Sequence, residues 1–268
     1  MHARRYELTE FEWSIISPLL PNKPRGVARA DDRKVLNGIY WRLRTGSPWA
    51  DIPERYGPAT TCYNRFVRWR KIGVWDAIFE AVSKAYRGDL QMIDSSSIRV
   101  HQHAANVKKG GRKTPTSPRL GTSLQPDGMG RSRGGLTTKI HAVVDADGNP
   151  IRLKLSEGQA HDGRSATDML ESIGPGQTLL ADRGYDSDAL RQKLADRGAW
   201  ANVKPMPGRV NIPVFSPYLY RFRNLVERFF NKLKHFRAIA TRFEKHDDNY
   251  LALVKLAAAR IWMRFMSR

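Results

Sequence analysis

Apolar residues recur at helical spacing over the first third of the chain. Thr9 and Glu12 have the pattern of a capping box, and the apolar residues that follow predict a first helix, which Pro21 ends. Further helices are predicted by apolar residues three or four positions apart, at about residues 31–45, 50–55, 58–71 and 75–85. This part of the chain therefore predicts an all-helical region.

The pattern changes after residue 88, where short apolar runs typical of strands alternate with helical segments. Two of these runs end in an acid, at Leu90–Asp94 and Gln177–Asp182. Two more, Thr137–Val144 and Ile151–Leu155, flank a strong hairpin-turn signal at residues 145–148. We therefore predict two domains, a helical one over residues 1–88 and an α/β one over residues 89–268.

The charge balance indicates the class of partner. Lys and Arg number 46 against 26 Asp and Glu, which gives a formal net charge of +20 and a pI near 10.4. Such an excess favours a polyanion, most simply nucleic acid. Cys62 is the only cysteine, which excludes a disulfide framework. No run approaches the ~20 apolar residues of a membrane span, and no signal peptide is visible, so we expect a soluble intracellular protein.

Two short helical segments separated by Gly57 and Pro58 resemble a helix-turn-helix, whose second helix enters the major groove of DNA. That second segment carries polar side chains suited to base edges and phosphates. They are Asn64, Arg65, Arg68, Arg70 and Lys71. The alternative is a basic, solvated face on a small helical bundle.

Residues 102–136 form a Gly-rich, basic stretch that predicts a loop along a phosphate backbone. We expect DNA contacts from its cations, in particular Lys108, Lys109, Arg131 and Arg133. His101 and His103 lie at its edge, without an acidic or cysteine partner nearby in the sequence to suggest a metal site.

Near the end of the chain stands the pattern Y-x2-R-x3-E-x6-K, formed by Tyr220, Arg223, Glu227 and Lys234. At about 100° per residue, a helix places these side chains within roughly 60° of one another. One helical face thus offers a carboxylate beside a phenol, a guanidinium and an ammonium, which suits a metal ion and a phosphodiester. The alternative is an ordinary i,i+4 surface ion pair between Arg223 and Glu227.

Asp94, Asp182 and Glu227 together supply what a two-metal phosphoryl-transfer site needs, namely carboxylates fixed on rigid elements. Hard oxygen ligands without thiolates favour Mg²⁺, with Mn²⁺ as a substitute.

Other acids compete for that role. Asp145 and Asp147 are expected to be turn residues, and Asp186 and Asp188 helix caps. The pair His161-Asp162 is the strongest competitor, because it follows a strand and opens a helix.

These motifs, with Gly134–His141 and Asp182–Tyr185, resemble a bacterial insertion-sequence DDE transposase, most closely of the insertion sequence 5 family within the insertion sequence 4 superfamily. The resemblance implies a ribonuclease-H-like mixed sheet flanked by helices and preceded by the helix-turn-helix-like domain. It also implies the catalytic, metal-binding triad Asp94, Asp182 and Glu227, with Tyr220, Arg223 and Lys234 holding DNA. Family members act as oligomers, and the implied location is the bacterial cytoplasm, at the nucleoid.

The expected activity is Mg²⁺-dependent hydrolysis at terminal inverted repeats, followed by transfer of the freed 3′-hydroxyls into target DNA. Its partners would be double-stranded repeat and target DNA. Two alternatives stay open: a non-catalytic helix-turn-helix regulator, and a ribonuclease-H-type nuclease.

Overall fold

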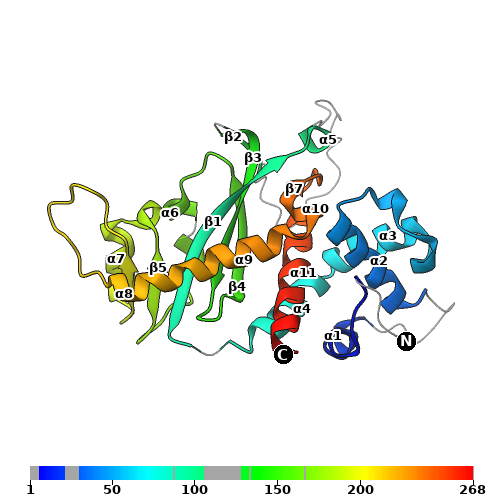
Figure 1. Cartoon of the computed structure of the whole chain (residues 1–268), viewed down its shortest axis with the longest axis horizontal. Helices are drawn as coiled ribbons and strands as arrows, with labels where there is room; N and C mark the ends of the chain where they lie inside the picture. The colour runs from blue at the N-terminus through cyan, green and yellow to red at the C-terminus, as the bar shows by residue number, and fades with distance from the viewer. Residues whose placement is uncertain are drawn as a thin grey trace, which may run out of the picture.

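A mixed β-sheet carries helices on both faces, and a group of helices adjoins it beyond α11 (Asp247–Met266) (Figure 1). The computed structural model describes residues 6–21, 30–86, 88–105, 128–132, 134–165 and 167–267. The predicted DNA contacts Lys108, Lys109 and Arg133, and most of the basic loop, lie outside these residues.

The sheet is built around one long strand, β1. Its strands, in chain order, are β1 Leu90–Val100, β2 Gly130–Ser132, β3 Gly135–Val144, β4 Pro150–Glu157, β5 Thr178–Ala181, β6 Trp200–Val203 and β7 Thr241–Arg242. The order across the sheet is β2-β3-β1-β5-β6, with β4 also paired to β3 and β7 to the end of β1. β1 runs antiparallel to β3 and parallel to β5, so the sheet is mixed, as predicted.

The N-terminal region is helical, as predicted. Its elements are α1 Glu10–Ile16, the 3₁₀ turns Ser17–Leu19, Trp49–Asp51 (η2) and Glu54–Tyr56 (η3), and the helices α2 Asp32–Thr45, α3 Ala59–Lys71 and α4 Val74–Ser83. The capping box is confirmed by hydrogen bonds of 3.1 and 2.9 Å between Thr9 and Glu12. The helix predicted at 50–55 is instead the two turns η2 and η3, since Pro53 between them has no N–H to continue a helix.

The remaining helices lie on the two faces of the sheet or at its ends (Figure 1). They are α5 Gln102–Ala105, α6 Asp162–Ser165, η4 Thr167–Leu170, η5 Arg183–Tyr185, α7 Asp188–Ala195, α8 Pro217–Tyr220, η6 Arg221–Arg223, α9 Asn224–Lys234, α10 Arg237–Ala240 and α11. α9 crosses one face of the sheet, and α11 runs between the sheet and α2 and α3 (Figure 1). The single helix predicted over Tyr220–Lys234 is therefore α8, a 3₁₀ turn and α9 in succession.

The pleat of β1 separates two hydrophobic clusters. Met92 and Ile98 join a cluster that runs through α9, α11 and the N-terminal helices, whereas Ile93 packs with β5, η4 and α7 on the other face. Because the helical region and the sheet share one cluster, the domain boundary at residue 88 stays a prediction. No helix in the described ranges is long and apolar enough to cross a membrane.

Candidate active site

The parallel register of β1 and β5 brings the two predicted aspartates level. Met92 pairs with Leu180, and two residues further along each chain stand Asp94 and Asp182. Side chains two positions apart share a face of the sheet, so both carboxylates lie on the face that α9 covers.

One detail of the prediction is wrong, because Asp94 does not end its strand. β1 continues to Val100 through its pairing with β3, in which Arg99 lies opposite Thr137. β5, in contrast, stops at Ala181, so Asp94 lies just where the neighbouring strand ends and leaves room beside it.

Arg223 joins the two aspartates to the glutamate of α9. Its Nη2 lies 2.7 Å from Asp94 Oδ2 and 3.8 Å from Asp182 Oδ2, and its Nη1 lies 2.6 Å from Glu227 Oε1. The Arg223 side chain is 15% exposed, against 56% for Glu227. Three carboxylates from three separate elements thus converge on one guanidinium, which makes the bland alternative of an isolated surface pair untenable.

The other two members of the Y-R-E-K pattern flank this cluster. Tyr220, at the end of α8, is half-buried between Phe215 and Lys204, whose Nζ lies 5.5 Å from the ring centroid. Lys234 is exposed at the end of α9, two turns and about 10 Å along the helix from Glu227. The cluster is therefore edged by groups that suit a phosphate backbone.

Electrostatics set Asp94 apart from an ordinary surface carboxylate. Burial raises the pKa of Asp94 to about 6, and the charges of Asp182 and Glu227 add to the rise, although Arg223 opposes it. The acids around Arg223 in turn raise its pKa against the opposing effect of burial. Burial also raises the pKa of Tyr220, which feels the charges of all three acids. The cluster is short of positive charge.

A fourth carboxylate lies behind Asp94. Asp162, at the start of α6, accepts hydrogen bonds from Ser95 Oγ at 2.9 Å and Lys139 Nζ at 3.0 Å. The backbone N–H of Ser95 donates to Asp94 Oδ1 at 2.8 Å. Sequence reasoning flagged His161-Asp162 but missed Ser95 and Lys139. The position of Ser95 directly after Asp94 could have indicated its role. The role of Lys139 is visible only in the fold, which brings it against Asp162.

The competing acids have structural roles. Asp145 Oδ1 accepts the backbone N–H groups of Asp147 and Asn149, as expected of a turn residue. Asp186 is not a helix cap; it binds Arg191 and Arg209, and Ser187 caps α7 instead.

The basic face predicted on the helix-turn-helix is only partly present. Arg65 is buried and paired with Asp32, so this predicted DNA contact is wrong. It falls on the stripe of α3 that packs inward with Cys62 and Trp69. Arg70 is ion-paired with Asp248 at 2.8 Å.

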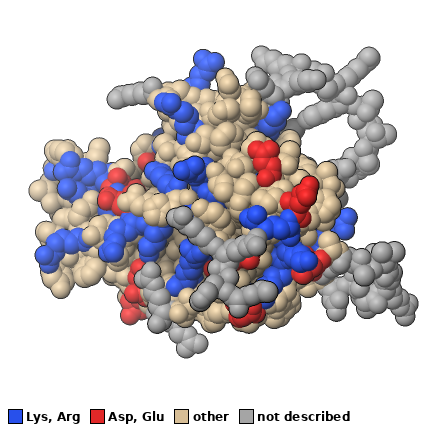
Figure 2. Space-filling model, turned by 45° about the vertical axis from the view of Figure 1, so that its right-hand side comes forward, with Lys and Arg blue, Asp and Glu red and all other residues tan. Residues whose placement is uncertain are grey.

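Asn64, Arg68 and Lys71 are exposed, as a DNA-facing side of α3 requires, and Arg131 is exposed on β2. Lys and Arg side chains are spread widely over the face shown in Figure 2 and outnumber the acidic ones there.

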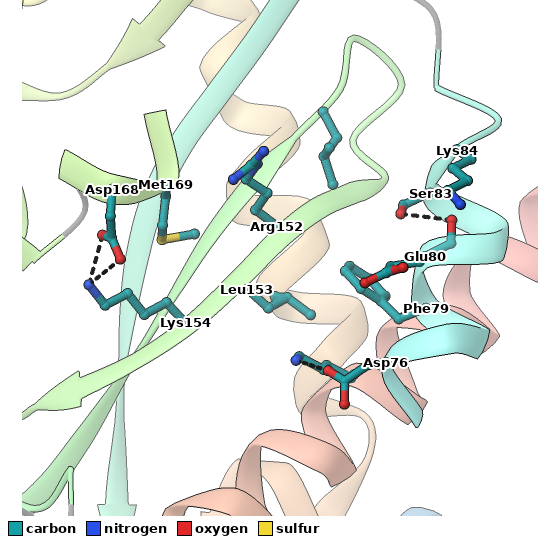
Figure 3. A pocket seen from close by; sticks show the side chains of 12 residues that line it. Asp76, Phe79, Glu80, Ser83, Lys84, Arg152, Leu153, Lys154, Asp168 and Met169 are labelled. Atoms are coloured by element: carbon teal, nitrogen blue, oxygen red, sulfur yellow. Dashed lines mark hydrogen bonds and ion pairs between the residues drawn. The ribbon is translucent and has the colours of Figure 1, made fainter. Parts of the chain in front are cut away.

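A second charged hollow, of about 620 Å³, lies between α4, β4 and α11 (Figure 3). Lys154 binds both carboxylate oxygens of Asp168, at 2.7 and 2.9 Å, and Lys255 pairs with Asp76. None of the three predicted catalytic acids lines this hollow.

In the described ranges, no three His, Cys, Asp or Glu side chains lie close enough together to share a metal ion. The three acids that the sequence predicts as metal ligands, Asp94, Asp182 and Glu227, are instead bound to Arg223, which stands between them.

Comparison with known proteins identifies the family of the chain. The family described as "Putative transposase of IS4/5 family" matches residues 8–79, and the family described as "Transposase DDE domain" matches residues 86–262. Among individual proteins, a putative transposase for insertion sequence element IS6501 of Brucella ovis is 42% identical over 130 residues, 48% of this chain and 100% of that protein. A putative transposase for insertion sequence element IS402 of Burkholderia cepacia is 30% identical, over 53% of this chain and 70% of that protein.

The fold also has a solved counterpart. A piggyBac transposase, seen in a synaptic complex with hairpin DNA, matches with a TM-score of 0.54 over 93% of this chain and 69% of that one, at 10% sequence identity. At that identity the likeness shows the fold alone. Because the DDE match spans about two thirds of the sequence, the chain belongs to the DDE transposases of the IS4/5 group, enzymes of DNA cleavage and strand transfer.

Proposed function

We propose that this transposase belongs to the insertion sequence 5 family, with Asp94, Asp182 and Glu227 as its catalytic triad. It binds the terminal inverted repeats of its element, hydrolyses phosphodiesters there and joins the freed 3′-hydroxyls to target DNA. The observation that carries this proposal is the convergence of three carboxylates on Arg223, at 2.7, 3.8 and 2.6 Å.

The arrangement of elements supports a ribonuclease-H-like catalytic domain over residues 89–268. One acid on β1, a second directly after the adjacent parallel strand β5 and a third on a helix across the same face are held by rigid elements, as phosphoryl transfer requires. The helical residues 1–88 would form the DNA-binding domain.

The residues present fit a divalent cation in kind, since the three side chains offer only carboxylate oxygens, the ligands that Mg²⁺ prefers. They also fit in charge, because three acids face a single guanidinium and Asp94 has a raised pKa. In the structure Arg223 stands between the three acids, so a cation would bind there only after Arg223 had moved aside. Bound there, Mg²⁺ or Mn²⁺ would lower the pKa of the attacking water or 3′-hydroxyl and stabilise the leaving oxygen.

Arg223 is suited to that movement. A guanidinium binds phosphate as readily as carboxylate, in the same forked geometry. A scissile phosphate entering the cluster would give Arg223 a new partner, and Asp94, Asp182 and Glu227 would then be the residues that hold the cation. Tyr220 and Lys234 then hold the flanking phosphates, at either end of the face that the triad occupies. Tyr220 is a positioning group and forms no covalent bond to DNA.

The exposed face of α3 with Asn64, Arg68 and Lys71 supplies the recognition of the repeat, and Arg131, with the basic stretch around it, follows the DNA backbone. Two element ends must meet for joining, so we propose that two or more copies of this chain act together on the paired ends.

The test is cleavage and joining of a labelled duplex that carries the element's own terminal repeat, with Mg²⁺ present. The expected products are a nick at the repeat boundary and a joined product in target DNA, with no protein–DNA adduct. Cleavage without repeat preference or joining would support a simple nuclease instead. Binding of the repeat without any cleavage would support a regulator, and an adduct that Tyr220→Phe abolishes would overturn the mechanism.

A further inference from the structure

A large cavity, of about 850 Å³, lies where the helical region meets the end of β1 and the segment before α11. Its lining comes from three separate parts of the chain: the helical region with Trp49 and Tyr63, then His101 and His103, and finally Phe243 to His246 with Asn249. His101 follows Asp94 by seven residues of nearly extended chain, so the cavity lies about 20 Å from the catalytic acids. It is a site apart from the active centre and large enough for a nucleotide.

Aromatic rings form much of its wall. Trp49 and Tyr63 meet edge to face with their ring centroids 5.4 Å apart. On the opposite segments, His101 lies 4.7 Å from both Phe243 and His103. Tyr63 is 40% exposed, so part of its ring is open to a ligand that stacks on it. Every nucleobase offers a flat π-face that such rings can hold.

Two residues that line the cavity also carry buried polar atoms without partners. Arg42 and Asn249 both line it and are only 3% and 6% exposed. Arg42 Nε and Nη1, and Asn249 Oδ1, have no hydrogen-bond partner among the residues that the structure describes. Buried polar groups are nearly always satisfied, so donors and an acceptor left over beside an aromatic cavity indicate a ligand with hydrogen-bonding edges.

The wall that carries these groups is built rigidly. Arg42 Nη2 binds Glu244 at 2.9 Å while its guanidinium lies over the Trp49 ring, 4.8 Å from the centroid. Arg242, fully buried, binds Thr138 Oγ1 at 2.7 Å and Asp247 Oδ1 at 2.6 Å. The cavity therefore exists before any ligand arrives, and little ordering is needed on binding.

Its position points to DNA as the source of the ligand. Tyr63 is followed in α3 by Asn64, on the exposed face that also carries Arg68. Lys245, an exposed cation, lies on the opposite wall. A duplex held along α3 would thus pass the mouth of the cavity with cations on either side for its phosphates.

We propose that this cavity binds one nucleobase that is unstacked from the bound DNA, with its ring against Trp49 and Tyr63 and its edge toward Arg42 and Asn249. The inference rests on the proposed function, because it takes the element's repeat as the bound DNA. Extruding a base costs a few kcal/mol, which stacking on aromatic rings offsets.

The test uses the terminal repeat as a series of duplexes, each with a single abasic site at a successive position, in metal-free buffer so that no strand is cut. Tyr63→Ala is the main variant, since the exposed ring can be removed without disturbing the core. Tyr63→Ala should bind the intact repeat about 5- to 30-fold more weakly than the wild type. At one abasic position the two proteins should bind equally, because the base that Tyr63 holds is gone.

Phe265→Ala is the matched control, an aromatic ring of similar exposure, 41%, near the other end of α11 from Asn249. It should bind every duplex as the wild type does. An equal loss for Tyr63→Ala on all abasic duplexes, or no loss on any, would overturn the inference while leaving the proposed function intact. A wild-type protein that binds no repeat would overturn the proposed function first, and this inference with it.

A second measurement separates DNA from free nucleotides as the source of the base. Calorimetric titration with each deoxynucleoside monophosphate should show no binding below millimolar concentration, because the base is delivered by the duplex. Tight binding of a free nucleotide that Tyr63→Ala abolishes, with no position-dependent effect on DNA, would show that the ligand is a free nucleotide and overturn the DNA source.

Discussion

The carboxylates around Arg223 and the charged hollow of Figure 3 contain similar residues in different proportions. In the hollow, two acids each have their own lysine: Asp168 binds Lys154 at 2.7 Å, and Asp76 binds Lys255. Around Arg223, three acids share one cation. The charges of these acid–lysine pairs in the hollow therefore cancel, whereas the three acids around Arg223 leave a net negative charge.

The pKa shifts express the same difference. Burial works against ionisation of Asp168, yet the hydrogen bonds from Lys154 leave its pKa below the ordinary value. Burial raises the pKa of Asp94 to about 6, and the single Arg223 cannot reverse the effect. An acid that its own neighbours fail to satisfy is a candidate for function, whereas a paired acid is more often structural.

Removing the acids should give the largest effect. Asp94→Asn, Asp182→Asn and Glu227→Gln should each lower strand cleavage about 10³-fold or more, since the cation they would hold contributes several kcal/mol to the transition state. Repeat binding should stay within a few fold of the wild type. The measurement is single-turnover cleavage of the labelled repeat with Mg²⁺.

Asp168→Asn is the matched control, a balanced acid in the hollow of Figure 3. It should cleave at nearly the wild-type rate. If the three triad variants cut like the wild type, the triad is misplaced, and His161-Asp162 becomes the next candidate.

Replacing Arg223, the one cation that the three acids share, should have smaller effects. It should raise the affinity for Mn²⁺ and lower the rate of DNA cleavage. Arg223→Gln should bind Mn²⁺ about tenfold or more tightly in the absence of DNA, because a competing positive charge is gone. The same variant should cleave DNA about 10- to 100-fold more slowly through loss of a phosphate contact. Free Mn²⁺, counted by electron paramagnetic resonance, measures the first, at pH 8.5 because this lies well above the pKa of about 6 that Asp94 has in the intact cluster.

Lys154→Gln removes a cation from the balanced hollow and should leave Mn²⁺ affinity unchanged. Weaker Mn²⁺ binding by Arg223→Gln at pH 8.5 would show that Arg223 helps to assemble the cation site instead of competing for it.

The pH dependence of folding stability should also differ between the acids around Arg223 and those in the hollow of Figure 3. The pKa of Asp94 is higher in the folded protein than its ordinary value of 3.8, so stability falls as pH rises from about 4 to about 6. In metal-free buffer at pH 8, Asp94→Asn should therefore be more stable than the wild type, by roughly 1–3 kcal/mol. The gain should shrink as pH falls through 6 toward 4.

Asp168→Asn should shift stability in the opposite direction. Its folded pKa is lowered, so its contribution is present at neutral pH and lost as pH falls. Urea unfolding at pH 8, 6 and 4.5 measures both variants, and shifts of the same sign would mean that the two regions do not differ in the way described.

The sequence was enough to predict the elements that carry the acids, because helix and strand periodicity are local. The helical N-terminal region, the short strands and the Tyr220-to-Lys234 pattern were all predictable from spacing. The spacing could not show that the 3₁₀ turn η6 interrupts the helix between Tyr220 and Asn224. The same spacing of residues is compatible with a continuous helix and with a helix that contains one tighter turn.

Contacts between distant segments were out of reach. Arg65 resembles its exposed neighbours on α3, and only the fold brings it against Asp32 from α2. The continuation of β1 past Asp94 depends on β3, which follows a long basic stretch. The spacing of the sequence could suggest only a pair between Arg223 and Glu227, four residues away, whereas the 2.7 Å contact of Arg223 with Asp94 joins segments 129 residues apart.

Asp162 shares features of both regions, and its replacement should have the smallest effect on cleavage. It has its own cation, Lys139, at 3.0 Å, yet it also accepts from Ser95, whose backbone N–H holds Asp94 Oδ1. Asp162→Asn should slow single-turnover cleavage about 5- to 10-fold, the value of one hydrogen bond to a charged group, with repeat binding retained.

A positioning role predicts more than a lower rate. The N–H of Ser95 lowers the pKa of Asp94, so a loosened Ser95 should move the acidic limb of the pH–rate profile to higher pH. Asp147→Asn, an exposed turn acid, should leave both rate and profile unchanged. A loss as large as that of the triad variants would make Asp162 a member of the reacting centre. A lower rate with an unshifted pH–rate profile would mean that Asp162 has only a packing role. A residue that acts through Asp94 should also change the pH at which Asp94 titrates.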